Sequence, residues 1–236
     1  MKCVIMQPTF LPWAGYFHLM AEADVFVFLD DVQLVKQSWQ TRNRILLNGQ
    51  PHWISVPIVH TSLRQNIFGT KLCAPQYWQD KLCRTLIQTY AHHPYGGAVN
   101  SLVTLLERPW GSLAALNIAL IHRICDGMGW WTTKCHLASE LNIHAPRTER
   151  LIKICEHFGC DEYLSPQGSR DYLEEDGFTT KTNIKLSFQD YTPAPYPQHG
   201  SDTFVSHLSM VDVLANLGWA GASEYATHRT PVMENA

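Results

Sequence analysis

The sequence predicts an α/β protein with a mainly parallel, Rossmann-like sheet flanked by helices, an appended β-hairpin and a helical insert. Three observations lead to this fold class: a strand, helix and strand near the amino terminus, an Asn-Gly turn between two extended runs, and alternating strands and helices in the last third. We interpret residues 1–236 as a single domain, with an α/β core over 1–60 and 130–218 and a helical insert over about 75–127.

The first unit combines an apolar run at 3–6, a helical pattern at 15–22 and a second apolar run at 25–29. A strand–helix–strand unit of this length places its two strands side by side and parallel. Ligands of open α/β sheets bind beyond the carboxyl ends of the strands. We therefore expect Gln7, Asp30 and Asp31, which follow these strands, to lie along the same edge of the sheet.

The later elements follow from local signals. Asn48-Gly49 between extended runs at 44–47 and 52–56 predicts a hairpin, and residues 76–127 predict three helices with breaks at 93–97 and 108–112. The last third predicts strands at 133–137, 162–165 and 184–188, and helices at 147–158, around Tyr172 and at 209–217. The proline-rich segment 190–204 predicts an ordered loop.

Composition excludes several classes of protein. With 45% apolar residues, 17% charged residues and a net charge of −3, the chain is neither disordered nor a basic nucleic-acid-binding protein. No apolar run reaches the 18 or so residues of a membrane span, so we expect a cytoplasmic location. The seven cysteines include no C-x-x-C pair, which favours buried thiols over a metal site or a disulfide framework.

The first candidate site gathers polar and aromatic residues after the first two strands. Adjacent carboxylates repel one another, and we expect Lys36 or Arg42 to balance the charge of Asp30 and Asp31. One carboxylate would act as a general base, and the aromatic rings would form a stacking floor. The alternative is turn capping, core aromatics and an ordinary ion pair. The cluster comprises Gln7, Trp13, Tyr16, Asp30, Asp31, Gln33, Lys36, Trp39, Arg42 and Asn43.

Three further motifs carry candidate binding residues, and helix or turn capping is an alternative for each. Thr148-Glu149-Arg150 opens a predicted helix, and the turn from Ser165 through Gly168 to Tyr172 presents backbone N–H groups suited to a phosphate or a carboxylate. Tyr196 and Gln198 lie in the proline-rich loop, before a helix that begins near Ser209 and Asp212.

Several long motifs resemble the WbqC-like protein family, and the similarity runs from Cys3 to about Gly218. Shorter matches occur around Thr148, Tyr163, Tyr196 and Ser209. The sequence departs from the family pattern after Ser165, where Pro166-Gln167 replaces Gly-Pro. The longest matches are Gln7-Pro8-x-x-x-Pro12-Trp13-x-Gly15-Tyr16-Phe17, Asp30-Asp31-Val32-Gln33-x-x-Lys36-x-x-Trp39-x-x-Arg42-Asn43 and Trp53-Ile54-Ser55-Val56-Pro57.

The resemblance implies a bacterial protein of surface-polysaccharide (O-antigen, lipopolysaccharide) biosynthesis that adds glycine or another acyl group to an amino sugar. We therefore expect an N-acyl or N-aminoacyl transferase acting on the amine of a nucleotide-linked amino sugar. The acyl donor would be acyl-CoA, an acyl-carrier-protein thioester or an aminoacyl-tRNA, of which the tRNA is disfavoured by the lack of a basic face. We expect no tightly bound cofactor.

In this hypothesis Asp31, with Asp30 as the second candidate, takes the proton of the amine. Arg42, Asn43 or the Ser165 turn stabilises the oxyanion. Trp13 and Tyr16 form a wall for the sugar, while Arg150 and the Gly168 turn hold the diphosphate.

Two alternatives remain open. One is an ATP-dependent nucleotidyl-transferring or ligase-type enzyme, because the strand, proline-rich turn, helix and strand loosely resemble the opening of adenylyl-transferring synthetases. In those proteins a histidine is expected where this chain has Trp13-Ala14-Gly15-Tyr16. The other is a non-catalytic binding protein of polysaccharide assembly, which predicts an apolar partner surface.

Overall fold

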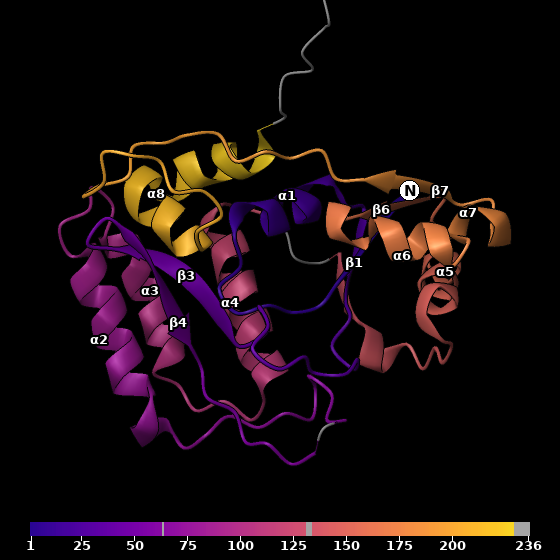
Figure 1. Cartoon of the computed structure of the whole chain (residues 1–236), viewed down its shortest axis with the longest axis horizontal. Helices are drawn as coiled ribbons and strands as arrows, with labels where there is room; N and C mark the ends of the chain where they lie inside the picture. Colours follow the sequence, from indigo (N-terminus) through magenta and orange to yellow (C-terminus); the bar gives the residue numbers. More distant parts are fainter. Residues whose placement is uncertain (63, 131–133, 229–236) are drawn as a thin grey trace, which may run out of the picture.

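A parallel five-stranded sheet forms the centre of the α/β part, with strand order β5-β2-β1-β6-β7 (Figure 1). The computed structural model describes residues 1–62, 64–130 and 134–228. The sheet confirms the predicted fold class, and the predicted strand at 133–137 begins at Cys135, residue 133 lying outside the described residues. The strands are β1 (Lys2–Met6), β2 (Val25–Phe28), β5 (Cys135–Leu137), β6 (Glu162–Ser165) and β7 (Lys185–Phe188).

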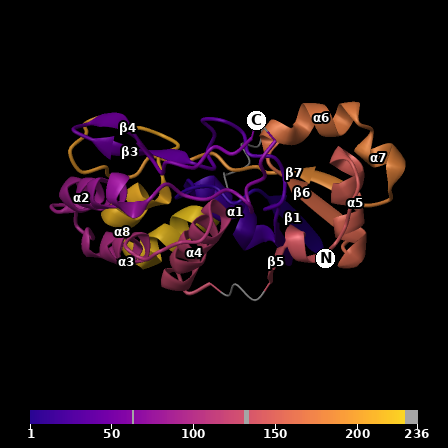
Figure 2. The ribbon, with the colours of Figure 1, turned by 90° about the horizontal axis from the view of Figure 1, so that it is seen from below.

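Helices cover both faces of the sheet. On one face, Val4 of β1 and Phe26 of β2 pack in the same apolar cluster as α1 (Ala14–Glu22) and α8 (Met210–Thr227). On the other face, the alternate strand residues Ile5 and Val27 pack with α5 (Arg147–His157), α6 (Arg170–Glu175) and α7 (Phe178–Lys181). This alternation is expected for strands buried on both sides. Figure 2 shows α5, α6 and α7 at the sheet end of the molecule, away from the hairpin.

The predicted hairpin forms a separate two-stranded antiparallel sheet from β3 (Arg42–Leu47) and β4 (Gln50–Ser55). Its turn residues Asn48 and Gly49 have φ values of 51° and 70°. A tight type I′ turn needs positive φ at both central positions, which explains why Asn-Gly identified the turn. The inner face of the hairpin carries Ile45 and Ile54, both buried in the larger apolar cluster.

The helical insert consists of α2 (Gln79–Tyr90), α3 (Gly97–Leu106) and α4 (Leu113–Gly127), after a short turn at Pro75–Tyr77. These are the three helices that the sequence predicts over 76–127. Leu86, Leu102 and Leu120, one from each helix, belong to the apolar cluster that also covers the α1 face of the sheet. The insert and the sheet therefore share one core.

Helix α8 is longer than the predicted helix at 209–217, because the chain resumes a helix after a kink at Gly218 (φ 69°, ψ −175°). Ser209 caps the helix by accepting a hydrogen bond from the Val211 N–H, as the capping interpretation predicts. Glycine often ends a helix, so the sequence alone favoured a stop at this position. The observed backbone conformation is accessible almost only to glycine.

Substitution of Gly218 by alanine is expected to lower the free energy of unfolding by about 1–3 kcal/mol. An added Cβ would lie 2.8 Å from Cδ1 of Tyr95, and φ would remain positive. The measurement is urea denaturation of the purified variant. Gly97→Ala is the matched control, because no heavy atom lies within 4 Å of its added Cβ. Equal stability of the two variants would contradict the prediction.

No helix of the described residues is both long and apolar enough to cross a membrane. All seven cysteines are free thiols, and Cys3, Cys83, Cys125, Cys155 and Cys160 are buried. Burial raises the pKa of Cys83 to about 11, which keeps this thiol protonated near neutral pH.

Candidate functional site

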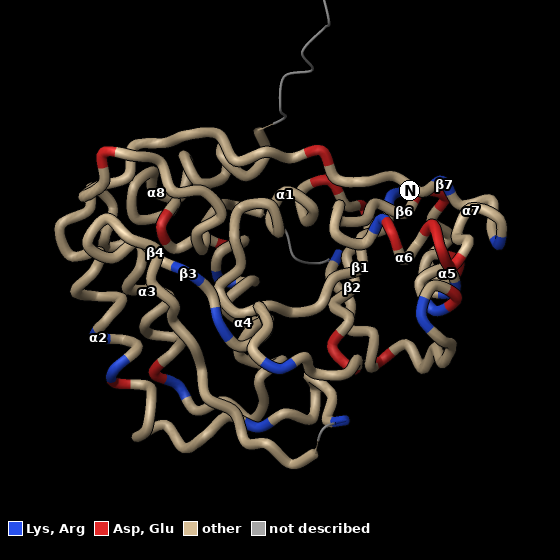
Figure 3. Tube along the Cα trace, viewed as in Figure 1, with Lys and Arg blue, Asp and Glu red and all other residues tan. Residues whose placement is uncertain are grey.

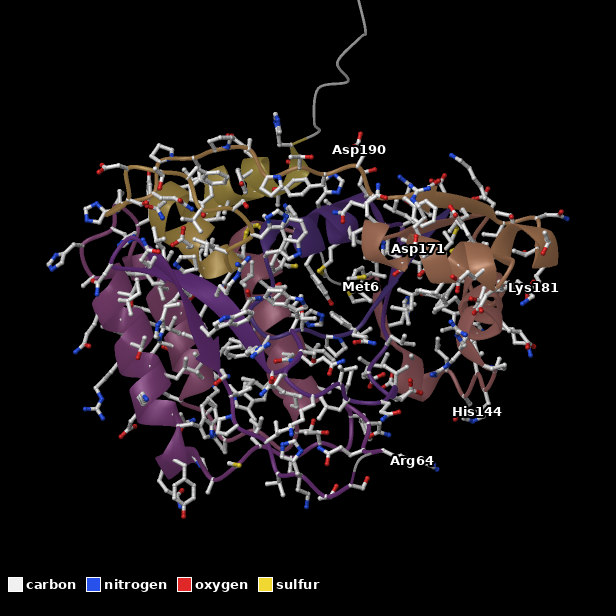
Figure 4. The ribbon with its side chains drawn as sticks, viewed as in Figure 1. Met6, Arg64, His144, Asp171, Lys181 and Asp190 are labelled. Carbon is white, nitrogen blue, oxygen red and sulfur yellow. The ribbon has the colours of Figure 1, made fainter. Side chains whose placement is uncertain are left out.

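Polar side chains follow the strands at the carboxyl edge of the sheet. Met6 of β1 pairs with Phe28 of β2, so Gln7 and Asp30 leave the sheet side by side. Figure 4 labels Met6 near the middle of the molecule, between the sheet part and the helical part. The residues that follow the strands are Gln7 after β1, Asp30 and Asp31 after β2, Ser139 after β5, Ser165 at the end of β6 and Gln189 after β7.

Asp30 is fully buried and fastens β2 to the segment after β5. Its Oδ1 accepts a hydrogen bond from the Ser139 N–H at 3.0 Å, and its Oδ2 accepts one from the Ser139 hydroxyl at 2.7 Å. Both carboxylate oxygens are therefore occupied. Of the two adjacent carboxylates, Asp30 is the one that fastens the edge of the sheet.

Asp31 pairs with Arg150, whose Nη2 donates to Asp31 Oδ2 at 2.6 Å. This pairing corrects the expectation that Lys36 or Arg42 balances the carboxylates. Arg150 reaches the edge because α5 leads into a parallel strand, which brings the first turn of the helix to the carboxyl ends of the strands. Both side chains are partly exposed, at 22% for Asp31 and 14% for Arg150. Asp31 Oδ1 and Arg150 Nε are covered atoms without a partner among the described residues.

Gln7 is held by two neighbours. Tyr16, only 2% exposed, donates its hydroxyl to the Gln7 carbonyl oxygen at 3.1 Å. Gln40 donates its side-chain amide to Gln7 Oε1 and accepts from the Val35 N–H, which ties the segment before the hairpin to β1. Tyr16 therefore lies behind the edge, where it positions Gln7, and does not line the surface as a wall.

Asn43 connects the hairpin to the turn after β1, and Trp13 connects that turn to the segment before α8. The buried Asn43 amide donates to the carbonyl oxygens of Phe10 and Leu11 at 3.1 and 2.8 Å, so its donors are used within the fold. Trp13, the residue before α1, packs its partly exposed ring against His207 with the ring centroids 4.6 Å apart. Trp13 is available as a wall residue, whereas Asn43 is a structural tie.

The remaining residues of the first cluster are exposed or half-exposed on the segment that leads into the hairpin. Gln33 forms an isolated bridge with Asn66, and Lys36 is exposed. Trp39 is 47% exposed, and the Arg42 guanidinium carbon lies 4.3 Å from the centroid of the Trp53 ring. Arg42 thus stacks on an aromatic side chain and does not pair with Asp31.

The turn after β6 has a buried part and an exposed part. The Ser165 hydroxyl is covered and has no partner among the described residues, whereas Gly168 is exposed. Tyr172, on α6, is half-buried, and burial raises its pKa. Helix α6 has only six residues, so its first turn is a weak basis for an anion site.

Two residues of the Thr148-Glu149-Arg150 motif make contacts elsewhere, of which Glu149 was a predicted binding residue. Glu149 is exposed and pairs with Lys153 at 2.8 Å, and this hydrogen bond lowers the pKa of Glu149. Thr148, beside it, is buried and donates to Asp176 at 2.8 Å. Of this motif, Arg150 is the member that contacts the carboxyl edge.

Tyr196 and Gln198 belong to a buried network at α8. The Tyr196 hydroxyl donates to Asp212 Oδ2 at 2.7 Å, and the Gln198 side chain exchanges two hydrogen bonds with the Val205 backbone. Burial and the charge of Asp212 raise the pKa of Tyr196. The structure gives these residues partners in α8 and in the loop, away from the strand ends.

A cavity of about 490 Å³ lies between the hairpin turn and the end of α2. His93 lines it, and both of its ring nitrogens are covered without a partner among the described residues. The rings of His93 and His199 are in contact, with centroids 4.8 Å apart. No group of three or more His, Cys, Asp or Glu side chains in the described ranges is arranged to hold a metal ion.

His93 is expected to make the protein less stable in acid. Burial, with the charges of His199 and His92, lowers its pKa from 6.5 to about 4. Because the pKa of the folded state is the lower one, the unfolded chain binds the extra proton between these values, and stability falls as the pH drops from 6.5 to about 4. The His93→Gln variant cannot bind this proton, so its free energy of unfolding, measured by denaturation across this pH range, should fall less than that of the wild type. If the free energy of unfolding changes with pH equally in the variant and the wild type, the lowered pKa of His93 is contradicted.

Four residues of the edge and the hairpin were not among the predicted site residues. Ser139 and Gln189 follow strands, so the rule that identified Gln7 and Asp30 also selects them once the later strands are known. Arg44 and Trp53 face each other across the hairpin. Their contact requires the strand register, although the i, i+2 spacing of Arg42 and Arg44 on an extended strand was a visible signal.

The fold and the edge define an α/β protein whose polar groups gather where open parallel sheets bind ligands. The chain belongs to the WbqC-like protein family, whose model matches residues 7–224, as the sequence motifs indicated. It is 29% identical over 231 residues to the Uncharacterized protein Rv1507c of Mycobacterium tuberculosis, covering 95% of this chain and 96% of that protein. No solved structure matches the chain significantly.

Proposed function

We propose that the protein is a transferase that adds an acyl or aminoacyl group, of the glycyl type, to the amine of a nucleotide-linked amino sugar. The product would enter bacterial surface-polysaccharide (O-antigen) biosynthesis. Membership of the WbqC-like family supports this context, and the polar edge of the parallel sheet supports a ligand site at that position.

The geometry of Asp31 is the observation that carries the proposal. One carboxylate oxygen is oriented by Arg150, and the other lacks a partner among the described residues. An unpaired, covered oxygen carries a free-energy cost, which a donor from a ligand removes. A substrate amine is such a donor.

The proposed reaction is a proton transfer followed by acyl transfer. Asp31 takes a proton from the substrate ammonium, and the free amine attacks the carbonyl carbon of a thioester or ester donor. A C–N bond forms, the donor C–S or C–O bond breaks, and the leaving thiolate or alkoxide takes the proton that the nitrogen loses after its attack. Acyl-CoA and an acyl-carrier-protein thioester, as thioesters, and aminoacyl-tRNA, as an ester, can each donate the acyl group in this reaction.

The oxyanion needs a donor whose hydrogen is not already used. Asn43 is occupied by the carbonyl oxygens of Phe10 and Leu11. The Ser165 hydroxyl has no partner among the described residues, and the Nη groups of Arg42 are the other candidates. Because Arg42 is stacked on Trp53 at the hairpin, we assign the oxyanion role to Ser165 in preference to Asn43.

The experiment that tests the proposal incubates the purified protein with uridine and thymidine diphosphate-linked amino sugars and each donor class. Mass spectrometry should detect a new amide, with release of free thiol from a thioester donor. Product that forms only with ATP, with pyrophosphate released, would support the ligase-type alternative instead. Binding of the amino sugars without product from any donor would favour the non-catalytic alternative.

A further inference from the structure

The outer face of the hairpin, with Trp39 just before it, carries a group of aromatic and cationic side chains, here called the hairpin face: the exposed Trp39 and Trp53 and the half-buried Arg42 and Arg44. In the antiparallel register Arg42 lies opposite Ser55 and Arg44 opposite Trp53. Since side chains alternate along a strand, both arginines point to the same side. Figure 3 colours the Lys and Arg positions along β3 blue.

The two tryptophans form a platform with the arginines stacked on it. The ring centroids of Trp39 and Trp53 are 5.3 Å apart at an angle of 36°. The Arg44 guanidinium carbon lies 5.9 Å from the Trp39 ring and 5.8 Å from the Trp53 ring, and that of Arg42 lies 4.3 Å from Trp53. A guanidinium that is stacked in this way keeps its fork of donors oriented.

The arginines of the hairpin face carry charge that the described part of the chain does not neutralise. Neither Arg42 nor Arg44 forms a salt bridge with a described carboxylate. Arg44 donates to the His207 carbonyl oxygen at 3.4 Å, a long hydrogen bond to a neutral acceptor. The face is therefore complementary to an anion, and arginine binds phosphate groups with two parallel hydrogen bonds.

Packing of the hairpin alone does not require this arrangement. The inner face, through Ile45 and Ile54, already anchors the hairpin in the core. Trp39 and Trp53 remain 47% and 45% exposed, so nearly half of the surface of each residue stays in water, where it contributes little to stability. Large exposed aromatic side chains that lie together are typical of binding surfaces.

We propose that the hairpin face binds the nucleoside diphosphate of the substrate, with the base stacked on the tryptophans and the diphosphate held by Arg42 and Arg44. This inference rests on the proposed function for the identity of the ligand. It replaces the expectation that Arg150 holds the diphosphate, because Arg150 is paired with Asp31. Trp39 is followed by the buried Gln40, whose side chain donates to Gln7, so the hairpin face is joined to the carboxyl edge by a direct hydrogen bond.

The test titrates the intact protein with uridine diphosphate, uridine and inorganic diphosphate, by tryptophan fluorescence and calorimetry. Uridine diphosphate should bind more tightly than either part. Arg44→Gln and Trp53→Ala should each weaken its binding about tenfold or more, the scale of a lost base–aromatic stack. Arg123→Gln, which removes an arginine 5.2 Å from the Trp219 ring elsewhere, is the matched control and should bind as the wild type does. Thermal melts verify that each variant is folded.

Three outcomes would overturn the inference: no binding of uridine diphosphate to the wild type, wild-type affinity in both hairpin variants, or equal affinity for inorganic diphosphate alone. The proposed function would survive each of them if amide formation is still observed. Conversely, loss of binding in the hairpin variants without amide formation from any donor supports the hairpin site and refutes the transferase.

Discussion

Asp31→Asn is expected to lower the rate of amide formation by about a hundredfold or more, the usual scale for loss of a general base. The asparagine side chain has the same shape and still accepts a hydrogen bond from Arg150, but it cannot take the proton of the substrate ammonium. The measurement is turnover at saturating donor and amino sugar, with a thermal melt to confirm folding.

Asp126→Asn is the control for this substitution, because Asp126 is an exposed carboxylate on α4. It loses the same charge and should leave turnover unchanged. If Asp31→Asn turns over at the wild-type rate with the true substrate, Asp31 is not the base. If both variants lose activity equally, the effect belongs to net charge and not to the geometry at the carboxyl edge.

The elements that the sequence predicts well are those with local causes. Buried parallel strands produce continuous apolar runs, so β1 and β2 are visible as 3–6 and 25–29. The hairpin turn depends on two adjacent residues, Asn48 and Gly49, that tolerate positive φ. The kink at Gly218 has an equally local signal, but a glycine at that position fits both a helix end and a kink followed by another helix.

The partners within the site could not be predicted in this way, because they depend on contacts between distant segments. Asp31 and Arg150 are 119 residues apart, and the sequence offers Lys36 and Arg42 as nearer cations. Of these nearer cations, Lys36 is exposed and Arg42 is stacked on the Trp53 ring. The residues at the carboxyl edge could be predicted because they directly follow strands in the sequence. The ion pair between Asp31 and Arg150 could not, because it depends on how α5 packs against the sheet.

The same limitation applies to Asp212, which fitted a helix cap in the sequence and is fully buried in the structure. Its carboxylate accepts hydrogen bonds from the hydroxyls of Tyr196 at 2.7 Å and Tyr90 at 3.2 Å, and from the Asn216 amide at 3.4 Å. These partners join α2, the proline-rich loop and α8. The network is a structural centre, and its loss should affect stability more than any single surface substitution.

Asp212→Ala is expected to lower the free energy of unfolding by about 3 kcal/mol, because the buried hydroxyls of Tyr90 and Tyr196 lose their acceptor and each unsatisfied group costs about 1–3 kcal/mol. Urea denaturation at neutral pH measures this loss. Tyr196→Phe removes one hydrogen bond and keeps the acceptor for Tyr90, so it should cost clearly less. A loss for Asp212→Ala no larger than for Tyr196→Phe would contradict the role of Asp212 as the shared acceptor.

The difference in stability between the wild type and Asp212→Asn, measured as a function of pH, is a second test of the same network. Burial, opposed by the hydrogen bonds from Tyr196 and Tyr90, raises the pKa of Asp212 above its usual 3.8. Since the folded state holds its proton more tightly, the contribution of Asp212 to stability is complete below pH 3.8 and declines as the pH rises through the raised pKa. Asparagine does not titrate, so the stability advantage of the wild type over Asp212→Asn should shrink from about pH 4 to neutral pH. A constant difference across that range would show that the carboxyl titrates alike in the folded and unfolded chains.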